Sequence, residues 1–159
     1  MADIAVEIGD LLRQKGLTLG TVESATGGLI AHIVTAVSGS SDYFKGSIVS
    51  YSNEIKNRII GVKAGTLEQY GAVSPQVAEE MAIGGKKLLN VDVCLADTGI
   101  AGPGGATPDK PVGLFYLGMA NKGGVFSRKH QFHGDRGRNK QSAALEALAW
   151  LKEYLTSLS

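Results

Sequence analysis

Three polar segments that follow apolar, strand-like runs contain the residue types most suited to chemistry. They span residues 23–28 (ESATGG), 51–56 (YSNEIK) and 97–105 (DTGIAGPGG). In open α/β sheets ligands bind beyond the carboxyl ends of strands, so we expect the three segments to meet at one crevice. Together they supply a hydroxyl, an amine and glycine-rich backbone, which are the groups that acyl transfer requires.

The first segment places Ser24 at a turn between a strand and a helix. Gly27 and Gly28 open that helix, where unpaired amides and the helix dipole favour an anion. Ser24 is therefore a candidate nucleophile, with the amides from Thr26 to Gly28 as its oxyanion hole. The alternative is structural, because serine and threonine are favoured helix caps and either Ser24 or Thr26 would serve as one.

The second segment offers Tyr51, Ser52, Asn53 and Lys56. A lysine beside a serine acts as a general base only where burial or positive neighbours lower its pKa from about 10.4. Most lysines are exposed, so the alternative for Lys56 is a solvated side chain on a short helix.

The third segment is the densest cluster among the 22 glycines of the 159-residue chain. Small residues let a backbone approach a phosphate or ribose closely. The candidates for such contacts are Thr98, Gly99, Ala101, Gly102 and Gly104. A G-x-G begins at Gly102, but Thr107 occupies the position of the third glycine of the dinucleotide-binding fingerprint. The loop also lacks the Gly-Lys pair of a P-loop. We therefore expect neither a dinucleotide-binding Rossmann enzyme nor a P-loop triphosphatase. The alternative of a plain surface loop is weakened because long loops in compact domains tend to be functional.

A basic cluster lies at residues 133–140 (HGDRGRNK), at the start of the last predicted helix. Cations are disfavoured there by the helix dipole unless an anion lies nearby. Arg136 and Arg138 are therefore candidates for a phosphate contact. A solvated helix end is the alternative.

The composition excludes several classes of protein. Sixteen basic and fifteen acidic residues give a net charge of +1, which argues against a nucleic-acid or anionic-membrane partner. No apolar run approaches the roughly 18 residues of a membrane span, and the acidic residues among the first ten argue against a signal peptide. The single cysteine, Cys94, predicts a reducing, cytoplasmic setting, and with only scattered histidines it predicts no metal centre.

The elements that must position these residues alternate along the chain. Hydrophobic periodicity predicts helices near residues 4–15, 29–37, 53–60, 75–89 and 136–155, and strands at 17–22, 46–51, 91–96, 112–120 and 125–132. The last two strands flank a hairpin signal, Asn121-Lys122-Gly123-Gly124. The pattern predicts one domain over residues 1–159, a three-layer α/β/α sandwich with a mixed, mostly parallel sheet and a late β-hairpin.

Four stretches together resemble the carboxy-terminal domain of the CinA (competence/damage-inducible protein) family. In order along the chain they are TVESATGGLIAHIVTAVSGSSDYFKGSIVSYSNEIKNRIIGV, YGAVSPQVAEEMA, TGIAGPGGATPDKPVG and FHGDR. Their order and spacing match the family from about Leu17 to the final helix. The resemblance is to the stand-alone form, without the amino-terminal domain of longer members and its pyrophosphatase-type activity.

The resemblance implies nicotinamide-nucleotide amidohydrolase activity. Nicotinamide mononucleotide and water would give nicotinate mononucleotide and ammonia, a step of pyridine-nucleotide salvage, without metal or cofactor. On matching positions it nominates Ser24 as the nucleophile and Lys56 as the group that manages the proton, directly or through Tyr51 or Ser52. The ribose and phosphate would lie against residues 98–105 and Arg136 or Arg138. Further contacts would come from the first two segments, at Thr26, Gly27, Gly28, Ser52 and Asn53. Ser52 and Thr98 remain competing hydroxyls.

Two positions depart from the pattern of the family. Ala25 stands where a cysteine is common, and we expect it to affect packing only. The Asp97-Thr98 pair replaces an apolar residue followed by a hydroxyl. We expect Asp97 either to adjust the protonation of the lysine or tyrosine, or to bond the loop backbone.

Two other functions remain open from the sequence. One is a non-catalytic, nucleotide-binding regulatory module, and the other is an amidase of another phosphorylated amide. We also expect a homo-oligomer, for which an edge strand of the hairpin would suit a dimer contact.

Overall fold

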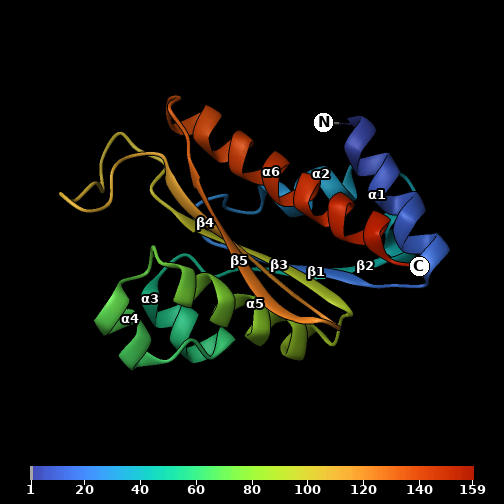
Figure 1. The fold of residues 1–159 in the computed structure, drawn as a ribbon, viewed down its shortest axis with the longest axis horizontal. Coiled ribbons are helices and arrows are strands. Elements are labelled where there is room, and N and C mark those ends of the chain that lie inside the picture. The colour runs from blue at the N-terminus through green and yellow to red at the C-terminus, as the bar shows by residue number, and fades with distance from the viewer. Residues whose placement is uncertain (1) are drawn as a thin grey trace.

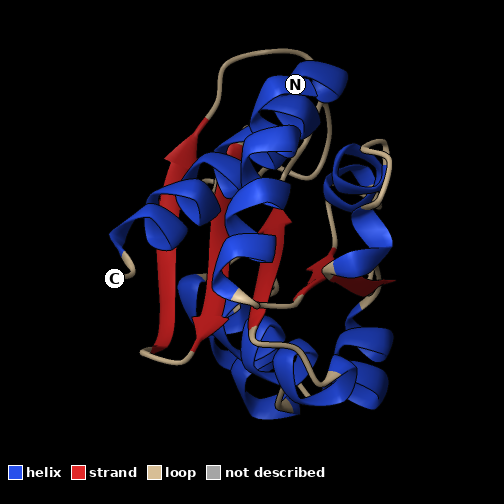
Figure 2. Ribbon diagram, turned by 90° about the vertical axis from the view of Figure 1, so that its right-hand side faces the viewer, coloured by secondary structure: helices blue, strands red, loops and turns tan. Residues whose placement is uncertain are grey.

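The computed structural model describes residues 2–159 and contains a sheet with helices on both faces (Figure 1, Figure 2). The strands of this part of the chain are β1 (Leu19–Glu23), β2 (Phe44–Val49), β3 (Val93–Gly99), β4 (Leu114–Asn121) and β5 (Gly124–Gln131). Their order in the sheet is β2-β1-β3-β4-β5. The mixed sheet and the late hairpin are confirmed.

The parallel part of the sheet is β2, β1 and β3, whereas β3–β4 and β4–β5 pair antiparallel. Within the described residues the pairings therefore divide evenly, where more parallel pairing was expected. The reason is that the glycine-rich loop returns the chain directly beside β3, whereas a parallel β4 would need a crossover to the opposite end of the sheet.

The helices form two outer layers. They are α1 (Ala2–Lys15), α2 (Leu29–Thr35), α3 (Asn53–Ile55), α4 (Ala64–Tyr70), α5 (Pro75–Leu89) and α6 (Arg136–Ser157), with the 3₁₀ turn η1 (Ser40–Asp42) and the π-helical turn η2 (Lys56–Ile60). Figure 1 shows α1, α2 and α6 on one face of the sheet and α3, α4 and α5 on the other. The predicted three-layer α/β/α sandwich is confirmed.

Side-chain alternation along β3 assigns its residues to the two cores. Val93 and Leu95 pack in the core under α1, α2 and α6, while Cys94 and Ala96 pack in the core against α5. Successive side chains of a strand point to opposite faces. Residues 97 and 98 therefore also face opposite layers, which determines the surroundings of the polar groups at the end of the strand.

Some element boundaries differ from the sequence expectation. β3 continues through Gly99, because the backbone of residues 97–99 pairs with β4 and is satisfied there. Gly99 fits that pairing because a Cβ on it would lie 2.3 Å from the Phe115 ring. β2 ends at Val49, two residues earlier than predicted, and α4 was not predicted. Among residues 2–159, no helix combines the length and apolar character needed to cross a membrane.

Candidate active site

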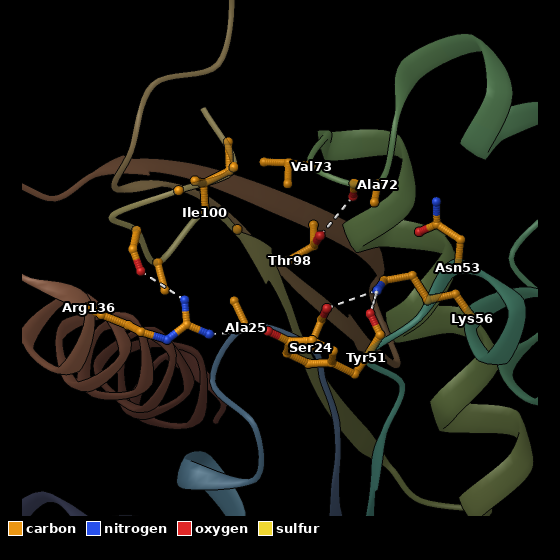
Figure 3. A pocket seen from close by; sticks show the side chains of 15 residues that line it. Ser24, Ala25, Tyr51, Asn53, Lys56, Ala72, Val73, Thr98, Ile100 and Arg136 are labelled. Carbon is orange, nitrogen blue, oxygen red and sulfur yellow. Dashed lines mark hydrogen bonds between the residues drawn. The ribbon is translucent and has the colours of Figure 1, made fainter. Parts of the chain in front are cut away.

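A cavity of about 420 Å³ opens at the carboxyl ends of the parallel strands (Figure 3). All three polar segments line it, together with the connection between α4 and α5 and the first residue of α6. The predicted residues that line it are Ser24, Tyr51, Asn53, Lys56, Thr98, Gly99, Ala101, Gly102, Gly104 and Arg136. The expected meeting of the three segments therefore occurs in the structure.

Ser24 and Lys56 are in direct contact within this cavity. The Lys56 Nζ lies 2.8 Å from the Ser24 Oγ, and it also donates to the backbone oxygens of Ser50 (2.9 Å) and Tyr51 (3.0 Å). Lys56 is 1% exposed and Ser24 is 7% exposed. Burial lowers the pKa of Lys56 to about 8, and the charge of Asp97 opposes that change.

The Lys56 amine donates to all three oxygens in the structure, which its protonated form, with three N–H donors, can do. When the amine loses one proton, two N–H donors remain for the two carbonyl oxygens. The lone pair then faces the Ser24 hydroxyl and can accept its proton. The carbonyls are available because β2 ends at Val49 and the chain leaves the sheet at Ser50 and Tyr51. The solvated alternative for Lys56 does not hold.

A short capped helix sets the position of Lys56. The Ser52 Oγ accepts from the Ile55 amide at 3.1 Å and caps α3, which continues into η2. Single π turns within helices are frequent at functional sites. Ser52 is exposed and does not line the cavity. Ser52 was expected as a competing nucleophile, a substrate contact or a proton relay, but in the structure its hydroxyl serves as a helix cap instead.

The Tyr51 side chain is also separate from the Ser24–Lys56 contact. Its hydroxyl accepts from Arg136 Nη2 at 3.2 Å, and only its backbone oxygen contacts Lys56. The structure therefore offers no relay through the Tyr51 hydroxyl, and Lys56 contacts Ser24 directly.

The amides of residues 26–28 do not form the expected oxyanion hole, because each already has an acceptor within the protein. The Thr26 amide donates to Asp97 Oδ2 (3.1 Å), the Gly27 amide to the Ser24 oxygen (3.0 Å) and the Gly28 amide to Glu23 Oε1 (3.1 Å). None of these three residues lines the cavity. Gly27 and Gly28 serve the turn itself, since their φ angles are +63° and +101°.

Glu23 is the acceptor that caps α2, a role the sequence reasoning gave to Ser24 or Thr26. Besides Gly28, its carboxylate accepts from the amides of Ile30 (2.9 Å) and Ala31 (2.9 Å). Its side chain is 0% exposed, so the helix dipole and these donors replace water around the charge. The sequence signal was an acidic residue directly before the segment that opens the helix.

Asp97 lies on the other side of the same turn. It accepts from the Ser24 amide (3.0 Å) and from the Thr26 amide, and the Thr26 hydroxyl contacts both Asp97 and Glu23. Burial raises the pKa of Asp97 to about 6, the Glu23 charge adds to the rise, and the hydrogen bonds from Thr26 and Ser24 oppose it. Asp97 thus bonds the Ser24 turn rather than the glycine-rich loop.

Several other backbone amides at the cavity have no acceptor in the part of the chain that the structure describes. Within residues 2–159, no oxygen accepts from the amide of Ala25, which directly follows Ser24. The same is true of Ala101, Gly102, Gly104 and Gly105 in the glycine-rich loop. These donors are available to a ligand, and unpaired amides of this kind bind anions.

Arg136 and Arg138 are placed differently. Arg136 lines the cavity, where its Nη1 donates to the Gly102 oxygen at 2.8 Å. Arg138 is exposed and lies outside the cavity, and its amide donates to the helix-capping Asp135 at 2.9 Å. Of the two arginines, Arg136 is therefore the one whose position fits the expected phosphate contact.

Asn139 was missed by the sequence reasoning. It is 1% exposed, and its Nδ2 donates to the Ala101 oxygen at 3.0 Å, which ties the glycine-rich loop to α6.

Thr98 lines the cavity, but its hydroxyl donates to the Ala72 oxygen at 2.7 Å. Among the competing hydroxyls in the described residues, Ser24 is the one in contact with an amine. No group of three His, Cys, Asp or Glu side chains there has metal-binding geometry.

Comparisons with known proteins point to one family. Residues 1–155 match the CinA C-terminal domain. A CinA-like protein of Geobacter metallireducens is 46% identical over 154 residues, which are 97% of this chain and 37% of that protein. A putative competence-damage inducible protein of Thermoanaerobacter pseudethanolicus is 49% identical over 148 residues, covering 93% of this chain and 36% of that protein. The chain thus spans little more than a third of these relatives.

Solved structures agree over nearly the whole chain. The competence/damage inducible protein CihA from Agrobacterium tumefaciens is 35% identical with a TM-score of 0.94, and the match covers 98% of this chain and 95% of that one. A CinA superfamily protein from Klebsiella pneumoniae is 29% identical with a TM-score of 0.95, and the match covers 99% and 98% of the two chains.

Proposed function

The chain belongs to the CinA C-terminal domain family, and from that premise and the geometry of its cavity we propose that it is a nicotinamide-nucleotide amidohydrolase. The observation that carries the proposal is the 2.8 Å contact between the buried Lys56 amine and the Ser24 hydroxyl. A non-catalytic module would need the glycine-rich loop but would have no use for a desolvated lysine against a serine.

The reaction begins at Ser24. Its Oγ attacks the carboxamide carbon of nicotinamide mononucleotide, and its proton passes to Lys56 Nζ. Lys56 then gives that proton to the leaving nitrogen, so that ammonia departs and an acyl ester remains on Ser24. Water attacks the ester with Lys56 again as base, and nicotinate mononucleotide leaves. The sum is nicotinamide mononucleotide plus water to nicotinate mononucleotide plus ammonia.

The unpaired Ala25 amide is the oxyanion donor that the site offers beside the nucleophile. The amide of the residue after a serine nucleophile has this role in other hydrolase folds. The other Ser24-turn amides are already bonded, so this assignment replaces the one made from the sequence.

The glycine-rich loop and Arg136 suit the nucleotide part of the substrate. The loop presents unpaired amides, and the Arg136 guanidinium is fixed by Gly102 and Tyr51. Binding energy from a remote phosphate orients the amide at the reacting serine.

The test is ammonia release from nicotinamide mononucleotide by the purified chain in the presence of EDTA. We expect turnover that the chelator does not reduce, and a covalent adduct on Ser24 when an acyl-enzyme is trapped by acid quench. Tight binding of the nucleotide without turnover would overturn the proposal in favour of a binding module. Release of ammonia only from another phosphorylated amide would overturn the choice of substrate.

A further inference from the structure

Asp97 is a buried carboxylate that the reaction steps do not use. It stands on β3 opposite Leu117 of β4, one residue beyond the last pair of β1 with β3, which joins Val22 to Ala96. Its carboxylate therefore lies across the end of β1, where the Ser24 turn begins. The side chain is 0% exposed.

Asp97 holds the backbone of the nucleophile. Its Oδ1 accepts from the Ser24 amide at 3.0 Å and its Oδ2 accepts from the Thr26 amide at 3.1 Å. Ser24 thus has Asp97 at its backbone nitrogen and Lys56 at its hydroxyl. A displacement of Asp97 would move the serine that Lys56 must reach.

The Thr26 hydroxyl joins Asp97 to a second buried acid. It contacts Glu23 Oε1 at 2.7 Å and also Asp97 Oδ1. A hydroxyl has one proton and donates to one acceptor, so two ionised carboxylates would leave one of these contacts without a proton. Glu23 also accepts from three amides at the start of α2. Burial raises the pKa of Asp97 to about 6, so Asp97 gains a proton at mildly acidic pH.

Among the described residues, the charged side chains near this cluster come from β1, η2 and α6. From β1 there is Glu23, from η2 there is Lys56, and α6 contributes Arg136 at the cavity and Lys140 beside Gly27. The turn leading into α2 presents backbone amides. α5 packs on the opposite face of β3 with apolar side chains, namely Val77, Ala78, Met81 and Ala82. The charge of Asp97 raises the pKa of Lys56, against the larger lowering effect of burial.

We propose that Asp97 is a positioning residue for the Ser24–Lys56 pair. Its carboxylate fixes the turn that carries Ser24, and its negative charge, bonded to the same serine that Lys56 contacts, favours the protonated form of the amine. This inference rests on the proposed function for its role in catalysis, but its physical content concerns only Ser24, Lys56 and Asp97.

The experiment titrates Lys56 in the full chain labelled with ¹³Cε-lysine, with the Lys56 signal identified by its absence from K56R. In the unsubstituted chain we expect a midpoint near pH 8. Asp97→Asn removes the negative charge, and we expect the Lys56 midpoint to fall by roughly 0.5–1 pH unit. The acidic limb of the kcat/KM profile should move by the same amount. The maximal kcat should also fall, because the side-chain NH₂ of the substituted residue is a donor and cannot accept from one of the two backbone amides, Ser24 or Thr26, that the carboxylate binds.

A matched control is available at the opposite end of the same strands. Asp92 accepts from the Thr18 amide at 2.8 Å and from the Thr18 hydroxyl, and so bonds the start of β1 as Asp97 bonds its end. Asp92→Asn should leave the Lys56 midpoint unchanged. If Asp97→Asn does not fold, Asp97→Ser removes the same charge with a smaller side chain that retains an acceptor.

The outcomes separate this inference from the proposed function. An unmoved Lys56 midpoint in a folded Asp97 variant overturns the inference, even where kcat falls, because lost structure alone would lower the plateau without shifting the limb. A shifted midpoint in a chain that releases no ammonia supports the inference and overturns the function. Equal shifts in the Asp97 and Asp92 variants would overturn the assignment to Asp97.

Discussion

The two glycine-containing turns at the cavity, residues 24–28 after β1 and 100–105 after β3, use their backbone amides in opposite ways. In the first, the amides of Thr26, Gly27 and Gly28 are bonded within the protein. In the second, the amides of Ala101, Gly102, Gly104 and Gly105 have no acceptor among the described residues. The first turn is a preformed support for a nucleophile that leaves only the Ala25 amide, among the described contacts of residues 24–28, without an acceptor, whereas the second turn has several amides free to bind a ligand.

The difference arises because buried carboxylates that accept hydrogen bonds lie beside the first turn. Glu23 and Asp97 flank the first turn and are both 0% exposed, so each must satisfy its oxygens with nearby donors. The glycine-rich loop has no comparable acid against it within residues 2–159, and its backbone is held instead by Arg136 and Asn139 through carbonyl oxygens. A glycine-rich turn therefore identifies a ligand site only when no side chain has taken its amides.

The largest expected effect concerns the nucleophile on the first turn. Ser24→Ala and Lys56→Met should each lower kcat by about 10³-fold or more, because each removes one half of a proton-transferring pair. The double variant should be no worse than either single one, since the two act as a unit. Steady-state ammonia release measures this.

Exposed residues of the same types provide the controls. Ser41→Ala in η1 and Lys122→Met in the hairpin turn should retain kcat. Full activity of Ser24→Ala would show that the nucleophile is elsewhere.

The next effect tests the support of the first turn. Glu23→Gln should lower the free energy of unfolding by about 2–4 kcal/mol, because a neutral amide replaces a buried anion that faces three helix amides. Urea denaturation measures this. Glu54→Gln, at an exposed ion pair with Arg58, should change stability by about 0.5 kcal/mol or less. Equal stability of both variants would contradict the role of Glu23.

A smaller effect tests ligand binding at the second turn. Arg136→Ala should raise KM by about tenfold, because the guanidinium fixes Gly102 and faces the cavity where we place a phosphate. Arg138→Ala should leave KM unchanged, since that side chain is outside the cavity. Equal increases for both arginines would point to general charge attraction rather than a contact.

The smallest effect separates the two kinds of glycine. Gly28→Ala should cost about 1 kcal/mol of stability because of its φ of +101°. Gly104→Ala should cost no stability, since no atom lies within 4 Å of an added Cβ, but it should raise KM if the nucleotide packs on the loop. Thermal unfolding and substrate saturation curves measure the two effects. A destabilised Gly104→Ala with unchanged KM would reverse the comparison.

Much of the fold follows from local signals in the sequence. The apolar run before Asp97, the period of the last helix and the Asn-Lys-Gly-Gly turn each predicted an element that the structure contains. Boundaries were less accurate, because β3 gains residues 97–99 from pairing with β4, a partner distant in sequence. The parallel or antiparallel sense of β4 likewise depends on which way the glycine-rich loop returns, and local propensity does not encode that.

At the site, the sequence by itself determined the chemical groups: a serine at a strand-to-helix turn, a lysine in the next such turn, and a glycine-rich third. These are local patterns, and parallel strands bring their carboxyl ends to one edge. Only the tertiary structure decided how each group is used. The burial of Lys56 against Ser24 and the bonding of the Ser24 and Thr26 amides by Asp97 depend on contacts between distant segments, and the positions of Ser52 and Arg138 outside the cavity depend on the same packing. Burial removes water from these polar groups, so each must find a partner, and the fold alone determines which partner is within reach.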